Sequence, residues 1–210
     1  CFATDGAIHA HGSFYALECY IYGLGVAYCQ ACSGIGYRAF YDCSSLASIT
    51  LPLTLKNIPV DAFLNCTSLT KVGFGSVETI GKFAFKGCEK LVEVELPTTL
   101  TELDPMSFYG CTSLEAVNVA EGNTSFKSTE GVVISADEEG NFNTLALYPA
   151  GKQGGYEVAE DIKNIGDRAF YYCSDTIITH IPDSVTYLGS GAFYSCYRIK
   201  DLTIGDGLTH

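Results

Sequence analysis

The chain has 210 residues, of which 47% are hydrophobic and 17% charged, and its net charge is −12 at neutral pH. This apolar content is ample for burial and argues against intrinsic disorder. The negative charge argues against partners such as nucleic acids and anionic membrane surfaces, because both select for Lys and Arg.

The first 34 residues fit no repeat, contain no Lys or Arg, and include two acidic residues. We treat residues 1–34 as a separate N-terminal segment, and three interpretations of it stay open: a degenerate capping coil, a different short module, or a translation-frame artefact. Its most apolar stretch, residues 14–29, is short, interrupted by Gly and contains Glu18. Direct membrane insertion is therefore not expected.

Cys29-x-x-Cys32 lies in the same segment, downstream of His9, His11 and Cys19. These residues have a local spacing that zinc sites use. Short Cys/His motifs match by chance very often, however, and this segment is rich in Cys. The sequence therefore favours a chance match, and we expect neither a metal nor a cofactor.

From residue 35 onward one phrase recurs, in which Ala-Phe (once Ser-Phe) is followed by a Cys three residues after the Phe. The aromatic residues are Phe40, Phe63, Phe85, Phe108, Phe170 and Phe193, at intervals of 23, 22, 23, 62 and 23 residues. The cysteines are Cys43, Cys66, Cys88, Cys111, Cys173 and Cys196. A period of this size indicates a solenoid, in which each repeat is one unit stacked on its neighbours. We therefore assign residues 35–210 to one repeat array.

Each repeat contains one short strand, as in the segment SITL. Ile49 and Leu51 face inward there, while Ser48 and Thr50 face outward, because side chains alternate along a strand. Stacked coils place successive strands side by side as a parallel sheet. The expected strands are Ser48–Leu51, Lys71–Phe74, Glu93–Leu96, Ala116–Val119 and Asp201–Ile204. The opposite side of the coil is expected to consist mostly of turns and short irregular segments.

The recurring Phe and Cys positions predict a structural spine. A Phe fills the space between layers, and a small, weakly polar Cys can fill the same tight corner in every coil. Ten cysteines would ordinarily suggest a disulfide scaffold. Their equivalent positions favour buried thiols instead, and we expect Cys43, Cys66, Cys88 and Cys111 to be reduced.

The interval between Phe108 and Phe170 is too long for two coils and too short for three. Residues 131–151 predict two strands joined by an acidic, Gly-containing turn. We therefore expect an inserted, hairpin-bearing repeat at about residues 120–160. The repeat at Cys173 is also shifted, with Thr176 and Thr179 where apolar residues are expected, which predicts a locally irregular coil.

The combined pattern Leu-x-x-Ile-x-Leu-Pro-x-x-Leu-x-x-Ile-Gly-x-x-Ala-Phe-x-x-Cys resembles the leucine-rich repeats of the BspA-like, or Treponema pallidum-type, family. The resemblance covers about residues 35–209. With the repeat pattern, it implies an α/β-type repeat solenoid dominated by β-structure: a right-handed coil with a parallel sheet on its concave face and a mostly irregular convex side. Members resemble surface or secreted proteins of bacteria and some protists, and several are implicated in attachment to host proteins. The family brings no catalytic residues.

We therefore expect a non-catalytic, surface or secreted module that binds proteins, with adhesion to host or neighbouring-cell proteins as its role. The alternative is a structural spacer or stalk of a larger surface protein or secreted enzyme. The chain starts at Cys1 and stops within a repeat, as expected of a fragment. The paired carboxylates of Glu93 and Glu95 could serve an acid–base enzyme. Two solvated acids on a sheet face are the favoured interpretation, because nothing indicates a perturbing burial.

The expected binding residues are the outward positions of the strands, because solenoids use extended concave faces for recognition. They are Ser48, Thr50, Lys71, Glu93, Glu95, Asn118, Asp201 and Thr203. This surface is polar, small and centrally acidic, without an aromatic anchor. We therefore expect a partner protein with a basic patch, such as an extracellular host protein.

Overall fold

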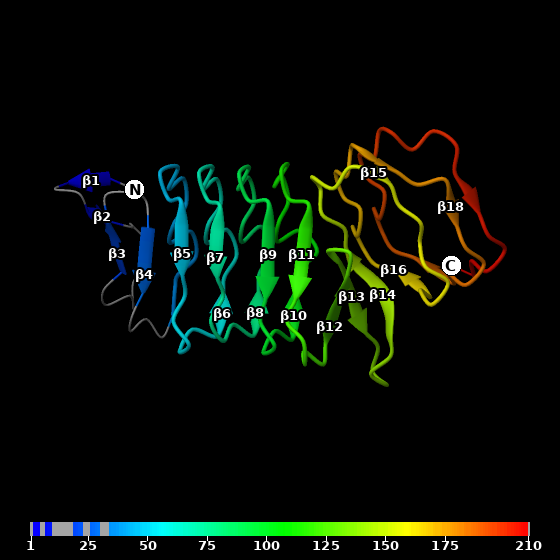
Figure 1. Ribbon diagram of the computed structural model, residues 1–210, viewed down its shortest axis with the longest axis horizontal. Helices are drawn as coiled ribbons and strands as arrows, with labels where there is room; N and C mark the ends of the chain where they lie inside the picture. Colours follow the sequence, from blue (N-terminus) through cyan, green and yellow to red (C-terminus); the bar gives the residue numbers. More distant parts are fainter. Residues whose placement is uncertain (1, 5–6, 10–18, 23–25, 30–33, 210) are drawn as a thin grey trace.

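The computed structural model describes residues 34–209 throughout and, before them, four strands at residues 2–4, 7–9, 19–22 and 26–29. The repeats form a row of coils stacked along one axis, and Figure 1 shows them side by side from residue 35 to the C-terminal end. The described residues contain strands and turns and no helix. The fold is thus the β-dominated repeat solenoid that the sequence predicts.

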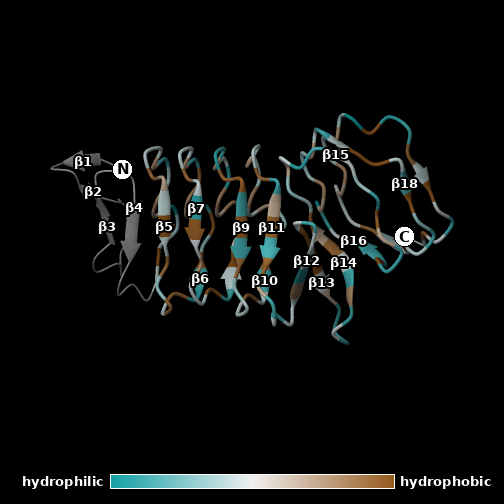
Figure 2. Ribbon diagram, in the orientation of Figure 1, coloured by the Kyte–Doolittle hydropathy of each residue, from teal (hydrophilic) through white to brown (hydrophobic). Residues whose placement is uncertain are grey.

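The outward-facing residues of the first coils lie on the strands of two neighbouring sheets. The first sheet includes β5 (Ser48–Thr50) and β7 (Lys71–Gly73), and a second, two-stranded sheet consists of β9 (Glu93–Leu96) and β11 (Ala116–Val119). β5 pairs with β7, and β9 with β11, in parallel and in repeat register, so that Val94 lies opposite Val117. Inward and outward residues alternate, and Figure 2 shows the corresponding alternation of hydropathy along β9. The expected strand at Asp201–Ile204 is shorter and spans Thr203–Ile204 (β20).

Four strands precede the repeats: β1 (Phe2–Thr4), β2 (Ala7–His9), β3 (Cys19–Tyr22) and β4 (Val26–Cys29). β1 and β2 form an antiparallel pair, as do β3 and β4. β4 also pairs in parallel with β5, with Val26 opposite Ser48. The first sheet therefore continues by one parallel strand into the N-terminal segment.

The opposite side of the coils is more regular than expected. It contains the two-residue strands β6 (Asn57–Ile58), β8 (Thr79–Ile80) and β10 (Glu102–Leu103), which form a parallel three-stranded sheet. Ile58 and Ile80 are buried while the preceding polar residue faces outward. A single inward-facing residue per coil, repeated at the same position, is enough to align these short segments into a ladder.

The aromatic residues of the first four repeats form one stack inside the coils. Neighbouring rings lie 4.9 Å apart for Phe40 and Phe63, 5.0 Å for Phe63 and Phe85, and 5.3 Å for Phe85 and Phe108, with interplanar angles of at most 8°. All four side chains are buried. The backbone supports the stack, because Phe63 N–H donates to Ala84 O of the next coil at 2.7 Å.

A second stack begins after the hairpin-bearing region and contains a residue that the repeat pattern does not identify. Phe170 and Phe193 stack with ring centroids 5.0 Å apart, and Tyr148 lies 4.8 Å from Phe170 on the other side. Tyr148 therefore occupies the aromatic position of its own coil. Its signal in the sequence is the segment Tyr-Pro-Ala-Gly, which replaces Phe-x-x-Cys there.

The thiols of the inner repeats share one environment. Each donates a hydrogen bond to the carbonyl oxygen of the aromatic residue one coil earlier, with Sγ–O distances of 2.9–3.6 Å. These cysteines are Cys66, Cys88, Cys111, Cys173 and Cys196, and all five are free. The position is therefore filled by a small side chain that also satisfies a carbonyl between coils.

Cys43 is an exception, and its expected reduced state is wrong. Cys43 is disulfide-bonded, and its partner lies outside the residues whose side chains the structure describes. The physical reason is position: Cys43 belongs to the first regular coil, next to a segment with four further cysteines. The equivalent cysteines of the later repeats, from Cys66 onward, are free.

Three antiparallel strands separate the two halves of the solenoid: β12 (Phe126–Thr129), β13 (Val132–Ala136) and β14 (Phe142–Leu147). Two of them lie where the sequence predicts a hairpin, and β12 precedes them. Neighbouring residues of β13 contact different cores, with Val133 in the N-terminal cluster and Ile134 in the C-terminal one. The sheet thus forms a wall between two hydrophobic cores.

The C-terminal coils contain short parallel strands. They are β15 (Gly154–Gly155), β16 (Asn164–Ile165), β17 (Thr176–Ile177), β18 (His180–Ile181) and β19 (Tyr187–Leu188). β14, β16 and β19 pair in parallel, as do β15 with β17 and β18 with β20. In the shifted repeat, Thr176 takes the buried position and donates its hydroxyl to Lys152 O at 3.1 Å, while Ile177 is exposed. The hydrogen bond explains how a Thr fits there.

Candidate binding surface

The strands β5, β7, β9 and β11 place two columns of outward side chains on one face, which we call the sheet face. Ser48 lies opposite Lys71 in one column, and Glu95 lies opposite Asn118 in the other. The residues between them, such as Val72 and Val94, are buried. The sheet face therefore presents side chains that the core does not use.

Most of the expected binding residues lie on the sheet face. Thr50, Lys71, Glu93, Glu95 and Asn118 are exposed, and Ser48 is partly exposed. Neighbouring coils bring them into rows along the solenoid axis. The structure thus brings together six of the eight residues that the sequence selects.

Asp201 and Thr203 are not part of this face. Thr203 lies on β20, which pairs with β18 in a separate two-stranded sheet beyond the wall formed by β12, β13 and β14. The Thr203 hydroxyl donates to Thr179 O at 3.0 Å and lies 3.0 Å from His180 Nδ1. Asp201 precedes β20, and the intervening sheet separates both residues from the rows of the sheet face.

The acidic turn of the β13–β14 hairpin is organised by one carboxylate. Asp137 accepts backbone hydrogen bonds from Asn141 at 2.8 Å and Glu139 at 3.0 Å, and a side-chain bond from Asn143 at 2.6 Å. The backbone donor of Asn141 and these other bonds lower the pKa of Asp137. Glu138 and Glu139 are exposed beside it. The turn therefore keeps a fixed, negatively charged surface.

Residues 34–209 contain no group of three or more His, Cys, Asp and Glu side chains that could hold a metal ion. The possible zinc ligands Cys29 and Cys32, with His9, His11 and Cys19, lie outside the residues whose side chains are described. None of the described residues form a helix long and apolar enough to cross a membrane.

The sequence pattern did not identify a group of aromatic side chains on the turns. Tyr109, Tyr171, Tyr172 and Tyr194 lie within ring contact of one another, away from the sheet face. Three of them follow the spine Phe directly, at equivalent positions of their repeats. That shared position is the signal by which they could have been found.

Comparison with known proteins agrees with this architecture. The sequence profile of the BspA type leucine rich repeat region matches residues 30–130 and 154–210, in six copies. None of the curated protein sequences compared with the chain matches it.

Several solved structures are similar to the chain. The pneumococcal vaccine antigen PcpA is 26% identical, with a TM-score of 0.66 over 78% of this chain and 40% of PcpA. A leucine-rich repeat protein from Eubacterium ventriosum is 21% identical, with a TM-score of 0.55 over 81% of this chain and 57% of that protein. A leucine rich cell surface protein from Faecalibacterium prausnitzii is 20% identical, with a TM-score of 0.50 over 84% and 65% of the two chains. The chain thus spans less than two thirds of each of these proteins.

Proposed function

The chain belongs to the BspA-type leucine-rich repeat family, and we propose that it is a non-catalytic protein-binding module of a surface or secreted protein. Its role is adhesion to host or neighbouring-cell proteins. The observation that carries this proposal is the sheet face, where β5 and β7, and likewise β9 and β11, present exposed polar side chains in register.

The charge of the sheet face indicates the kind of partner. Glu93 and Glu95 are exposed on one strand, and Lys71 is the single basic residue of the expected set on this face. Residues 121–161 add eight acidic residues against two Lys. A partner with a basic patch fits this distribution, because complementary charge favours encounter and register.

The sheet face also indicates the strength of binding. Its side chains are small or charged, and the aromatic residues and Arg that dominate most interfaces are absent from the selected positions. A single contact is therefore weak. Many copies on a surface would compensate, because multivalent attachment multiplies weak affinities.

The test is a charge reversal on the sheet face. Glu93→Lys with Glu95→Lys should weaken binding to an immobilised basic extracellular protein, such as lysozyme, and added salt should weaken wild-type binding. A matched control, Glu89→Lys with Glu102→Lys, makes the same change in net charge at exposed residues away from this face. Binding is measured by biolayer interferometry, with serum albumin as the acidic reference protein.

An equal loss of binding in both double variants would show that the overall charge of the chain accounts for the interaction, and it would contradict a site on the sheet face. Binding unaffected by salt and by Glu93→Lys with Glu95→Lys would place the site elsewhere. Absence of binding to any extracellular protein would favour the alternative, a spacer or stalk.

A further inference from the structure

The turns that precede the strands carry a second surface, which we call the tyrosine platform and define as Phe83, Tyr109, Tyr171, Tyr172 and Tyr194. Its rings form one connected group, with centroid distances of 5.9 Å from Phe83 to Tyr109, 5.0 Å from Tyr109 to Tyr172 and 5.0 Å from Tyr171 to Tyr194. Tyr194 is 54% exposed and Tyr172 is 37% exposed. None of the five residues belongs to either hydrophobic core cluster.

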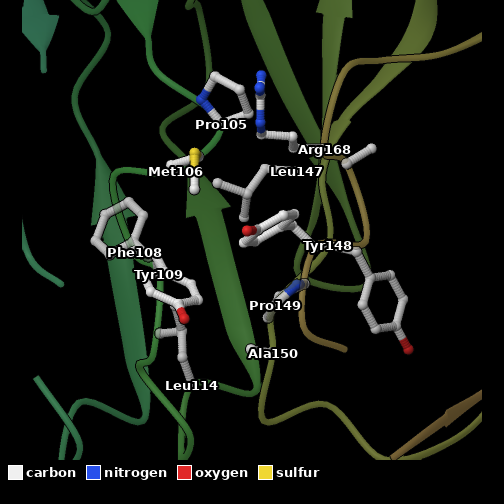
Figure 3. A pocket seen from close by; sticks show the side chains of 12 residues that line it. Pro105, Met106, Phe108, Tyr109, Leu114, Leu147, Tyr148, Pro149, Ala150 and Arg168 are labelled. Carbon is white, nitrogen blue, oxygen red and sulfur yellow. The ribbon is translucent and has the colours of Figure 1, made fainter. Parts of the chain in front are cut away.

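The platform crosses the break between the two halves of the solenoid. Tyr109 contacts Tyr171 and Tyr172, which lie more than 60 residues later in the chain. The coil between them has Pro149 at the position that Tyr109 and Tyr171 take in the coils on either side. Pro149 lines a cavity of about 20 Å³ together with Tyr109 and Tyr171, and Figure 3 shows Tyr109 and Pro149 at this cavity. The small Pro side chain lets the tyrosines on either side meet.

Positively charged side chains surround the rings. The Lys86 ammonium lies 5.0 Å from the Phe83 ring centroid and 5.2 Å from that of Tyr109, and Lys82 lies 5.0 Å from Phe83. Arg168 lines the same cavity as Tyr109 and Tyr171. Cation–π contacts of this kind hold a charge over a ring while leaving it open to a further partner.

These three cations are not neutralised by ion pairs. Among residues 34–209, the ion pairs involve Arg38, Lys56, Lys127 and Arg198, and none includes Lys82, Lys86 or Arg168. Three acidic residues of the neighbouring turns have other partners. Asp61 pairs with Arg38, Asp104 accepts from Met106 N–H at 2.8 Å, and Asp167 accepts from Ser190 N–H at 2.8 Å. In a chain of net charge −12, the platform thus has three cations beside its rings that no ion pair neutralises.

We propose that the tyrosine platform is a second protein-binding site, and that its occupant is an acidic segment of a partner protein with an apolar anchor residue. Tyr and Arg are the residues that carry most binding energy at interfaces. The rings would take the anchor, and Lys82, Lys86 and Arg168 would pair with carboxylates around it. The charge preference is opposite to that of the sheet face, so the two sites select different partners.

The test uses short synthetic peptides with one central Leu, flanked by Asp and Glu, by Lys, or by Ser. The chain contains no Trp. Binding can therefore be followed both by biolayer interferometry and by the change in tyrosine emission of the protein. The acidic peptide should bind about tenfold more tightly than the neutral one, a difference of about 1.4 kcal/mol.

Two variants and two matched controls locate the site. Tyr194→Ser, and Lys82→Glu with Lys86→Glu, should each weaken binding of the acidic peptide about fivefold or more. The controls are Tyr197→Ser, at a tyrosine that is 74% exposed and outside the ring group, and Lys90→Glu with Lys200→Glu, at exposed lysines. Both controls should bind as the wild type does, and so should Glu93→Lys with Glu95→Lys. This last result separates the platform from the sheet face.

Three results would overturn the proposal. The first is an acidic peptide that binds no more tightly than the Lys peptide, or not at all up to about millimolar concentration. The second is a loss of affinity in the controls equal to that in the platform variants. The third is a neutral oligosaccharide that binds at the platform when the acidic peptide does not, which would assign the tyrosines to a glycan.

Discussion

The thiol of Cys66 donates a hydrogen bond to the carbonyl oxygen of Phe40, one coil earlier, with 3.1 Å between Sγ and O. The same oxygen accepts the backbone N–H of Cys43 at 3.2 Å. One carbonyl is thus held by two donors from two successive coils. The arrangement repeats at Cys88 and Phe63, where the Sγ–O distance is 3.3 Å. The cysteine at this position therefore donates a hydrogen bond between coils, in addition to filling a small space in the core.

This burial predicts an order of thiol reactivity. Desolvation raises the pKa of Cys66 and Cys173, and raises that of the less buried Cys196 to about 11. The thiolate is the reactive form, so iodoacetamide should label Cys196 first among the five free cysteines and leave Cys66 and Cys173 unlabelled in the native protein. Peptide mapping by mass spectrometry measures this order. A disulfide between Cys66 and Cys88 in the non-reduced protein would contradict it.

The same pKa shifts predict a loss of stability in alkali. An unfolded thiol titrates near 8.5, roughly, and the folded pKa of Cys66 lies above that value. The native chain then holds protons that the unfolded chain releases, so the stabilisation is complete below the unfolded pKa and falls as the pH rises above it. The loss for one such thiol is about 1.4 kcal/mol at a pH one unit above the unfolded pKa. Urea unfolding at pH 7.5 and 9.5 should show a smaller loss in Cys66→Ala than in the wild type, and equal losses would exclude this origin.

The aromatic stack predicts a large cost for truncation. Phe85 is fully buried and stacks on both Phe63 and Phe108. Phe85→Ala should lower the free energy of unfolding by about 3–5 kcal/mol, and the unfolding should spread to adjacent coils because each depends on its neighbours. Phe83→Ala, two residues away on a half-buried ring, is the control and should cost clearly less. If Phe85→Ala lowered the free energy of unfolding by less than about 1 kcal/mol, the aromatic stack would not stabilise neighbouring coils as proposed.

The coil between the two stacks depends on one close backbone contact. Gly151 N–H donates to Leu114 O at 2.8 Å, and a Cβ at Gly151 would lie 2.5 Å from Leu114 N and 2.5 Å from Ser113 C. Those backbone atoms cannot move aside without disturbing the coil. Gly151→Ala should therefore lower the unfolding midpoint in urea substantially. Gly155→Ala, where no atom lies within 4 Å of the added Cβ, should leave the midpoint nearly unchanged. Similar midpoints for the two variants would show that the contact relaxes freely.

The strands β5, β7, β9 and β11 and the inner aromatic positions could be predicted from the sequence, because the same pattern of residues recurs at the same positions of each repeat. The alternation that buries Ile49 and exposes Thr50 recurs at Val94 and Glu95. Tyr148 could not be placed in this way, because Tyr-Pro-Ala-Gly replaces both the Phe and the Cys of its repeat. The repeat period likewise does not show that Thr203 is separated from the sheet face by antiparallel strands.

Two further features escaped prediction because they depend on contacts between non-equivalent positions. The disulfide partner of Cys43 is none of the other cysteines of the repeats. The contact of Tyr109 with Tyr172 bypasses a whole coil, since the small Pro149 lies in between. A periodic pattern predicts contacts between neighbouring repeats well. It does not predict which residues meet where the period is broken.

Asn123 joins the coil of β9 and β10 to the start of the antiparallel strands. Its side-chain nitrogen donates to Pro97 O and Leu100 O, both at 2.9 Å, and its side-chain oxygen accepts from the backbone N–H groups of Ser125 and Phe126, both at 2.8 Å. The residue is 8% exposed. Although Asn123 begins an Asn-x-Ser sequence, its nitrogen is not accessible for glycosylation in the folded chain.

Asn123→Asp should therefore be strongly destabilising, although it changes a single atom. The carboxylate cannot donate to Pro97 O or Leu100 O, so it leaves two carbonyls without their donor and places a negative charge beside them. Each buried polar group left without a partner costs about 1–3 kcal/mol, and we expect a total loss of at least about 2 kcal/mol. Asn118→Asp, the same substitution at an exposed residue of the sheet face, should change stability by no more than about 0.5 kcal/mol. Urea unfolding of both variants at pH 7 measures the difference. If Asn123→Asp were as mild as Asn118→Asp, the four hydrogen bonds of Asn123 would contribute little to stability.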